Sequence, residues 1–213
     1  MIDDIRKQWL NEFRDARAVH ATIILTCGVT FLQLFGRSLT PSIDWHDLLW
    51  ATPAVFEQDE FWRPLTANFV HLLGISHLIV NMVGLALAGP FVESDYGAFR
   101  YLLIYTVSGY VAWSFHAVLG LSGSGASAAV VGPIAALCVA SVAHYAQSIR
   151  ARRQLVLAIL LSIIWLLVGF IIDDRELPLI GVMNIANDVH IVGFATGLIL
   201  GIIFLPCRSP DQG

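Results

Sequence analysis

Five long stretches of the sequence contain no Asp, Glu, Lys or Arg, and this constrains the fold more than any other feature. They have 19, 29, 49, 19 and 19 residues and lie between Arg17 and Arg37, Arg63 and Glu93, Arg100 and Arg150, Arg153 and Asp173, and Asp188 and Arg208. A helix needs about 20 apolar residues to cross a bilayer. The longest stretch therefore holds two helices and a tight turn, and the sequence predicts six membrane spans.

The composition agrees with this interpretation, because 57% of the residues are hydrophobic and 13% are charged, whereas soluble proteins have about 25% charged residues. We expect an all-α polytopic membrane protein, folded as a bundle of six transmembrane helices. The predicted spans cover about residues 20–36, 70–90, 99–119, 127–147, 154–172 and 189–206. Residues 1–18 precede the membrane domain, 19–206, and a short tail, 207–213, follows it.

The distribution of basic residues predicts the orientation in the membrane. With the N-terminus in the cytoplasm, nine of the 12 Lys and Arg residues lie on the cytoplasmic side, and the other three, Arg37, Arg63 and Arg175, lie outside. Cytoplasmic loops are enriched in Lys and Arg. Both termini are therefore predicted to be cytoplasmic, in a multi-pass protein of a plasma or inner membrane.

Residues 1–18 leave two interpretations open. Ile2, Ile5, Trp9 and Phe13 recur at helical spacing among charged residues, which is typical of an amphipathic helix at the membrane interface. The alternative is a solvated cytoplasmic tail. Because acidic and basic residues are mixed before the first apolar run, no cleavable signal peptide is predicted.

The sequence predicts neither a metal site nor a cofactor. Cys27, Cys138 and Cys207 form no Cys-x-x-Cys pair, so neither a disulfide framework nor a zinc site is indicated. The chain also lacks the His-Glu-x-x-His motif of zinc proteases. We expect the lipid bilayer and other membrane proteins as partners, and no nucleic acid; the sequence predicts no oligomeric state.

Polar side chains at membrane depth are costly and are functional candidates for that reason. Here they come from three predicted helices and share the outer half of the membrane: His71, His77, Asn81, Ser122, Ser124, Ser127 and His190. No carboxylate or lysine in the spans marks an ion path, which argues against a transporter. The six-residue separation of His71 and His77 does not align two haem ligands on one helix face.

The glycine-rich turn at residues 120–127 lies in the middle of the longest uncharged stretch. Its small residues allow the chain to dip into the protein before the next helix begins. A serine at the start of that helix, Ser127, has backbone N–H groups and the positive end of the helix beside it, which suits the stabilisation of an oxyanion. An ordinary N-cap serine in a flexible turn is the alternative.

Small residues predict a close contact between the fourth and sixth spans. Gly193, Gly197 and Gly201 form one stripe, and small residues of the fourth span, including Ala128 and Gly132, offer a matching surface. Such a contact would bring His190 to Ser127, as base and nucleophile. Asp188 is two residues from His190 and does not share its helix face, so the arrangement is a dyad.

These residues resemble the rhomboid family of intramembrane serine proteases over about residues 61–204. The matching pieces follow the family order: Trp62-Arg63, His71, the segment from His77 to Asn81, the segment from Gly89 through Glu93 to Gly97, the segment from Gly125 to Gly132, and His190 with Gly193 and Gly197. Any one piece is weak, but the ordered set on a six-span frame is specific.

The resemblance implies that Ser127 is the nucleophile and His190 its general base, and that His77 and Asn81 help the Ser127 N–H hold the oxyanion. It assigns scaffold roles to Trp62, Arg63 and Glu93, and structural roles to Gly125, Gly193 and Gly197. The implied activity is hydrolysis of a peptide bond in or near the transmembrane segment of another membrane protein, which enters the site laterally.

The sequence departs from the family pattern after the nucleophile. Ala128 replaces the usual glycine, Val131 replaces the usual aromatic residue four positions after the serine, and His71 and His77 are six residues apart instead of five. Ser122 also fits a Gly-x-Ser-Gly pattern, but the helix begins directly after Ser127. The alternative function is a catalytically silent rhomboid-like protein that binds and escorts membrane clients.

Overall fold

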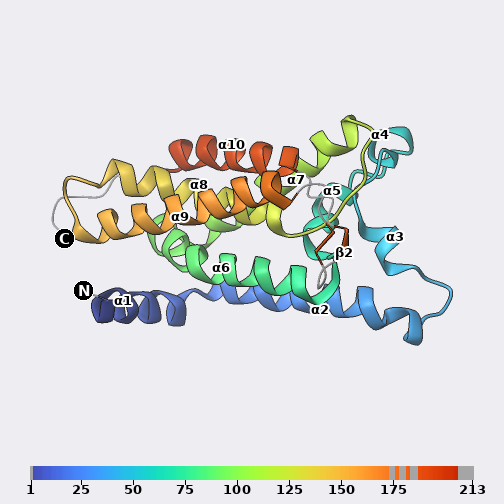
Figure 1. The fold of residues 1–213 in the computed structure, drawn as a ribbon, viewed down its shortest axis with the longest axis horizontal. Coiled ribbons are helices and arrows are strands. Elements are labelled where there is room, and N and C mark those ends of the chain that lie inside the picture. The colour runs from blue at the N-terminus through green and yellow to red at the C-terminus, as the bar shows by residue number, and fades with distance from the viewer. Residues whose placement is uncertain (1, 173–175, 178–180, 183–186, 206–213) are drawn as a thin grey trace.

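A computed structural model describes residues 2–172, 176–177, 181–182 and 187–205. Its long helices run side by side along one axis of the molecule (Figure 1). Each of the six predicted apolar segments forms a helix, and these are α2 (Arg17–Leu39), α6 (Gly74–Tyr96), α7 (Ala98–Val118), α8 (Ser127–Ala143), α9 (Ile149–Ile172) and α10 (Asn187–Ile203).

The prediction of six spans is confirmed only in part. Among the described residues, the segments Arg17–Gly36 and Gly74–Tyr96 are long and apolar enough to cross a membrane, whereas the apolar helices α8 and α10 have 17 residues each. At about 1.5 Å per residue, a helix of that length is shorter than a hydrocarbon core of about 30 Å. The structure therefore shows a helix at each of the six predicted segments, but it does not by itself show six spans.

Short elements join the long helices. Residues 40–73 contain α3 (Trp45–Leu49), α4 (Ala54–Glu57), α5 (Arg63–Thr66) and the 3₁₀ helix η1 (Ala67–Phe69). Within the described residues, the chain is all-helical, as predicted, apart from one short hairpin between α9 and α10. There β1 (Glu176–Leu177) and β2 (Gly181–Val182) pair antiparallel, with Glu176 opposite Val182. Two-residue strands are too short to leave a periodic pattern in the sequence.

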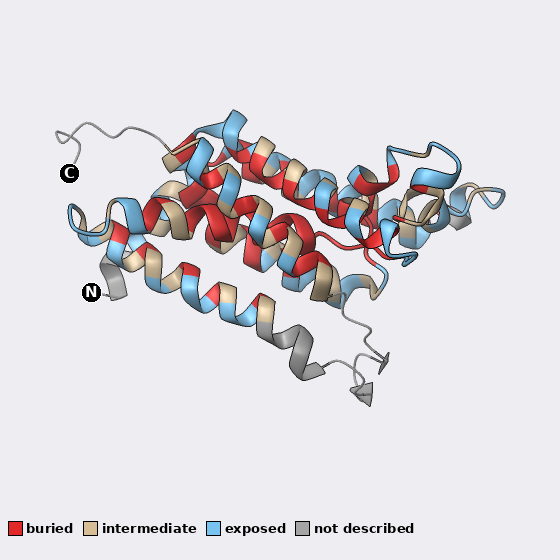
Figure 2. Ribbon diagram, turned by 90° about the horizontal axis from the view of Figure 1, so that it is seen from above, coloured by how far each residue is buried: buried red, intermediate tan, exposed pale blue. Residues whose placement is uncertain are grey.

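Helix α8 lies at the centre of the bundle, and α6, α7, α9 and α10 surround it. Every residue of α8 from Ser127 to Leu137 is buried, and Figure 2 shows the buried residues gathered along this helix and the facing sides of its neighbours. A helix that is apolar on all sides belongs in the interior. Its many Ala and Gly residues let the neighbouring backbones approach closely.

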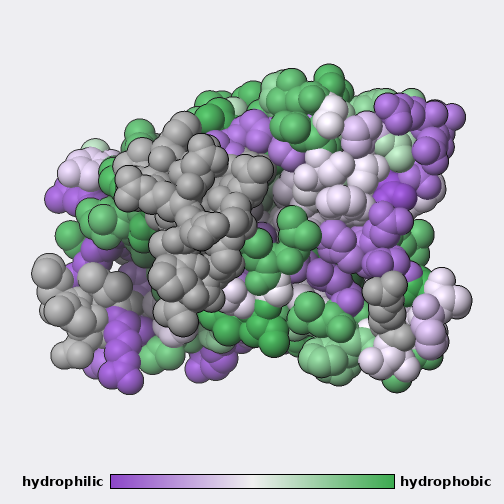
Figure 3. Space-filling model, turned by 45° about the vertical axis from the view of Figure 1, so that its right-hand side comes forward, coloured by the Kyte–Doolittle hydropathy of each residue, from purple (hydrophilic) through white to green (hydrophobic). Residues whose placement is uncertain are grey.

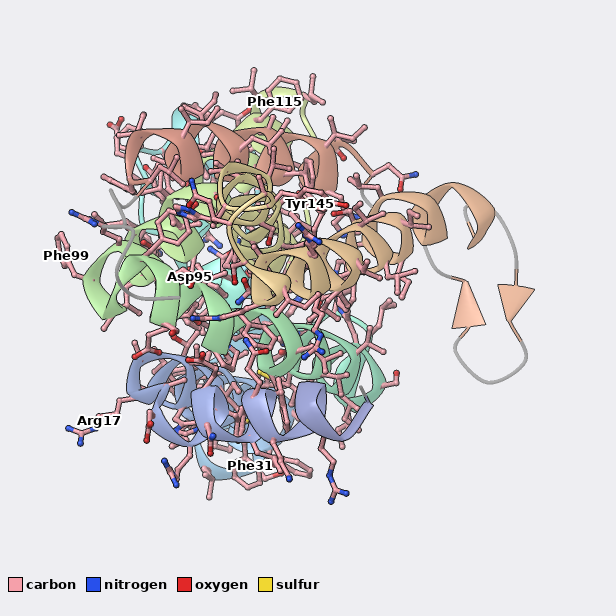
Figure 4. All side chains as sticks on the ribbon, turned by 90° about the vertical axis from the view of Figure 1, so that its left-hand side faces the viewer. Arg17, Phe31, Asp95, Phe99, Phe115 and Tyr145 are labelled. Atoms are coloured by element: carbon pink, nitrogen blue, oxygen red, sulfur yellow. The ribbon has the colours of Figure 1, made fainter. Side chains whose placement is uncertain are left out.

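Large apolar side chains cover the sides of the bundle. Ile24 is 71% exposed and Phe99 is 73% exposed, and in Figure 4 Phe31, Phe99 and Phe115 project outward. Figure 3 shows apolar residues over the sides and hydrophilic residues gathered near the end that carries residues 40–73. Exposed apolar patches of this extent are typical of surfaces that contact a membrane or another protein.

Helix α1 (Ile2–Asp15) docks on the bundle at the opposite end. Figure 4 shows it crossing the near end of the molecule in front of α2. The Trp9 indole N–H donates to the Ala86 carbonyl of α6 at 3.0 Å. Arg150 at the start of α9 pairs with Glu12 of α1 and with Asp95 of α6, each at 3.0 Å. The segment for which the sequence left an interfacial helix and a solvated tail open is thus a helix docked on the bundle. The predicted tail 207–213 lies outside the described residues.

Candidate active site

The glycine-rich loop before α8 is held by hydrogen bonds to three other segments of the chain. Ala51 and Gly123 form an antiparallel bridge, with N–H to carbonyl distances of 3.0 and 2.9 Å. The Gly125 N–H donates to the Ala67 carbonyl at 2.9 Å, and the Trp113 indole donates to the Gly125 carbonyl at 3.2 Å. Gly125 has φ +145°, a conformation that residues with a Cβ rarely adopt. These contacts hold the loop against the bundle rather than in solvent.

Ser127 is the first residue of α8 and is 8% exposed. Ser122 is exposed and lies in the preceding loop, before the bridge at Gly123. The predicted nucleophile and its competitor in the sequence therefore lie in different surroundings. Only Ser127 combines burial with the start of a helix, where free backbone N–H groups and the helix dipole favour negative charge.

The glycine stripe of α10 packs on α8, as the sequence predicts. A methyl group on Gly193 would overlap the Ala128 carbonyl and would lie 2.9 Å from Val131 Cγ2, and one on Gly201 would lie 3.0 Å from Ala136 Cα. These pairs advance together along both helices, so α8 and α10 run in the same direction. His190, almost one turn before Gly193, therefore lies at the same end of the bundle as Ser127.

His190 is 8% exposed, and its Nδ1 has no hydrogen-bond partner within the described residues. No hydrogen bond joins it to Ser127 Oγ in that part of the chain. Catalytic hydrogen bonds are often long in free enzymes and tighten when substrate binds. The structure thus places the predicted base and nucleophile at one end of two packed helices, without a direct bond between them.

His77 and Asn81 lie one turn apart on α6, on the side facing the loop before Ser127. A methyl group on Gly125 would lie 2.5 Å from His77 Cε1 and 3.0 Å from His77 Nε2. His77 Nδ1 and Asn81 Nδ2 are buried, and neither has a partner among the described residues. Buried amide and imidazole nitrogens without partners are rare. The ring of His77 lies against Gly125, two residues before the start of α8.

His71 supports the residue before Ser127. Its Nδ1 lies 2.9 Å from the Thr30 hydroxyl, and that hydroxyl donates its proton to the Phe69 carbonyl at 3.0 Å. His71 Nδ1 must therefore carry the proton, which leaves Nε2 to accept the Ala126 N–H at 3.4 Å. The ring is fully buried. The sequence grouped His71 with the site, and the structure connects it to the loop backbone.

The predicted scaffold residues Trp62 and Arg63 lie in the loop 40–73. The buried Arg63 guanidinium pairs with Glu60 and donates to the carbonyls of Asp47 and Trp50. Five donors in a planar fork allow one arginine to hold several acceptors in this way. Trp62 is 46% exposed. Arg63 thus ties together the loop that carries Ala51, the partner of Gly123.

Glu93 was predicted to anchor a helix end, and its partner is the start of α2. Its two carboxylate oxygens accept the N–H groups of Ala18 at 3.0 Å and Val19 at 2.9 Å. The N-cap residue of α2, Ala16, supplies no side-chain bond. A carboxylate from α6 therefore satisfies two free N–H groups of α2 and complements its helix dipole.

Two contacts at the site were not predicted from the sequence. His116 Nδ1 at the end of α7 lies 2.7 Å from Asp188 Oδ2 at the start of α10. His46 Nε2 of α3 lies 3.5 Å from the Ser124 hydroxyl. Both join residues more than 70 positions apart, so no local spacing reveals them. Within the described residues, no group of three His, Cys, Asp or Glu side chains is placed to hold a metal ion.

Residues 58–207 match the family model of the Rhomboid domain. The chain is 32% identical to RHOMBOID-like protein 4 of Arabidopsis thaliana over 154 residues, which are 71% of this chain and 36% of that protein. It is 32% identical to Rhomboid protease GluP of Bacillus subtilis over 145 residues, 68% of this chain and 26% of that protein. It is also 38% identical over 66 residues to Inactive RHOMBOID-like protein 8 of Arabidopsis thaliana, 31% of this chain and 18% of that protein. The chain thus spans less than half the length of these three relatives.

Proposed function

Because the chain belongs to the rhomboid family, whose members are membrane-integral and generally intramembrane proteases, we propose that it is a serine endopeptidase that cuts transmembrane segments of other membrane proteins. One observation carries this proposal. The contact of Gly193 with the Ala128 carbonyl sets the start of α10, with His190, beside the start of α8, with Ser127.

In the proposed mechanism, Ser127 Oγ attacks the scissile carbonyl while His190 takes its proton. The Ser127 N–H, His77 and Asn81 donate hydrogen bonds to the developing oxyanion, since fixed donors in a water-poor site stabilise such charge strongly. His190 then protonates the leaving amine. Water hydrolyses the acyl-enzyme, with His190 again acting as base.

We further propose that α2 and α6–α10 are six spans and that both termini face the cytoplasm. The dyad then lies in the outer half of the membrane, in a cavity that admits water from outside, and substrates enter laterally from the bilayer. The N-terminal segment 1–18 lies at the cytoplasmic interface, ahead of the membrane domain 19–206 and the tail 207–213. A reporter fused after Gly213 should be cytoplasmic; an external signal would contradict this topology.

A second function has one observation in its favour, because one relative is named inactive. A rhomboid-like protein without catalysis would bind membrane clients and release them uncut. The presence of both Ser127 and His190 supports the protease instead. The two functions differ in whether Ser127 reacts covalently.

The test is labelling of the purified protein with a fluorophosphonate, together with cleavage of a model transmembrane substrate. The parent should be labelled at Ser127, and Ser127→Ala should lose labelling and cleavage, as should His190→Ala. Ser122→Ala is the matched control, because its hydroxyl is exposed and five residues upstream, and it should keep substantial activity. Loss of labelling and cleavage in Ser122→Ala alone would identify Ser122 as the nucleophile. Equal cleavage by the parent and all variants would favour client binding.

A further inference from the structure

The ends of α7 and α10 are joined by a largely buried hydrogen bond between His116 and Asp188. His116 Nδ1 lies 2.7 Å from Asp188 Oδ2, and their side chains are 7% and 25% exposed. His116 lies in the last turn of α7, and Asp188 lies in the first turn of α10. The Asp188 carboxylate therefore complements the dipole of α10, and its hydrogen bond to His116 joins the first turn of α10 to the last turn of α7.

The same end of α7 also contacts the loop that leads to Ser127. One turn before His116, Trp113 donates its indole N–H to the Gly125 carbonyl at 3.2 Å. The two rings are in edge contact, with centroids 5.5 Å apart. A methyl group on Gly123 would lie 2.7 Å from Trp113 Cζ3 and 3.4 Å from His116 Nε2. Trp113 and His116 thus form one surface that the loop touches.

Asp188 does not act on His190 as the acid of a catalytic triad. Its carboxylate is bonded to α7, whereas His190 Nδ1 has no hydrogen-bond partner within the described part of the chain. In a triad, the third residue orients the imidazole directly. Here the position of the His190 ring depends on where the first turn of α10 is held.

Resting on the proposed function, we propose that His116 and Asp188 are positioning residues that set the distance between His190 and Ser127. Helix α7 holds the loop before Ser127 through Trp113 and the start of α10 through His116. It therefore fixes both members of the dyad relative to one rigid helix. Misplacement of a reacting group by about 1 Å costs on the order of a hundredfold in rate.

The test measures kcat and KM on a model transmembrane substrate and the rate of fluorophosphonate labelling. His116→Ala and Asp188→Ala should each lower kcat about ten- to a hundredfold, with KM within about twofold of the parent. The double variant should be no slower than the slower single variant, because the two side chains act as one unit.

Two controls separate positioning from a general loss of structure. His116→Asn keeps an N–H donor near the position of Nδ1 and should recover most of the lost kcat. Glu57→Ala removes an exposed carboxylate of α4 at the same end of the molecule and should match the parent. A higher KM and a lower folded fraction with an unchanged kcat would contradict the proposal. A kcat for His116→Asn as low as that of His116→Ala would contradict it too.

The outcome also separates this inference from the proposed function. A parent that is labelled at Ser127, with His116→Ala and Asp188→Ala reacting at the parent rate, overturns the positioning role alone. A parent that is neither labelled nor able to cleave overturns the proposed function, and the positioning role with it.

Discussion

Gly197 of α10 lies directly on the backbone of Gly132 of α8, so that a methyl group on Gly197 would lie 2.5 Å from Gly132 Cα. On its other side, Gly132 faces Ser108 of α7, where a methyl group would lie 2.5 Å from Ser108 Cβ. Helix α8 is therefore clamped between α7 and α10 at one residue. The backbones of α8 and α10 can approach this closely only because the contacting residues, Gly132 and Gly197, have no side chains.

Gly197→Ala should destabilise the protein and lower its activity. The added methyl group meets backbone atoms that cannot rotate away, and overpacking of this kind costs about 1–3 kcal/mol of unfolding free energy. Thermal unfolding in detergent measures the loss. Gly28→Ala of α2 is the matched control, because a methyl group there meets nothing within 4 Å. Equal melting temperatures for the two variants would contradict the close contact.

Glu93→Ala should loosen the start of α2. It removes the acceptors of the Ala18 and Val19 N–H groups, both in buried residues, and each buried donor left without a partner costs about 1–3 kcal/mol. Glu93→Gln keeps one acceptor and should lose less. Unfolding midpoints of the parent, Glu93→Gln and Glu93→Ala should fall in that order. A midpoint for Glu93→Ala equal to that of the parent would refute the anchoring role.

The positions of the helices could be predicted from the sequence because uncharged stretches of the required length show where they lie. The contact of α8 with α10 was also predictable, since close backbone approach needs small residues at helical spacing, as at Gly193 and Gly197. The His116–Asp188 pair was not, because it depends on how α7 and α10 are rotated about their axes. Glu93 was expected to anchor a helix end, but its partner lies 74 and 75 residues away.

The contact of His46 with Ser124 should weaken in acid. Burial lowers the pKa of His46 below its ordinary value of 6.5, against the opposing effect of Asp44 and Asp47. The packed position of His46 therefore disfavours its protonation relative to a position in solvent. This packing is fully stabilised above about pH 6.5 and is weakened as the pH falls toward the lowered pKa.

Limited proteolysis within residues 44–52, at pH 7.5 and at about pH 5 with a protease active at both, measures this weakening. Cleavage of the parent should increase in acid. His46→Gln cannot take the proton, so its cleavage should depend less on pH. Parent cleavage that is independent of pH would contradict the role of His46.

His77→Ala and Asn81→Ala should each lower kcat without unfolding the protein. Both side chains hold a buried nitrogen with no partner among the described residues, and His77 lies against Gly125, two residues before Ser127. An oxyanion donor contributes about a hundred- to a thousandfold to kcat. The loss should appear in kcat more than in KM, because the interaction strengthens only as the negative charge develops. Activity equal to the parent in both variants would place the oxyanion donors elsewhere.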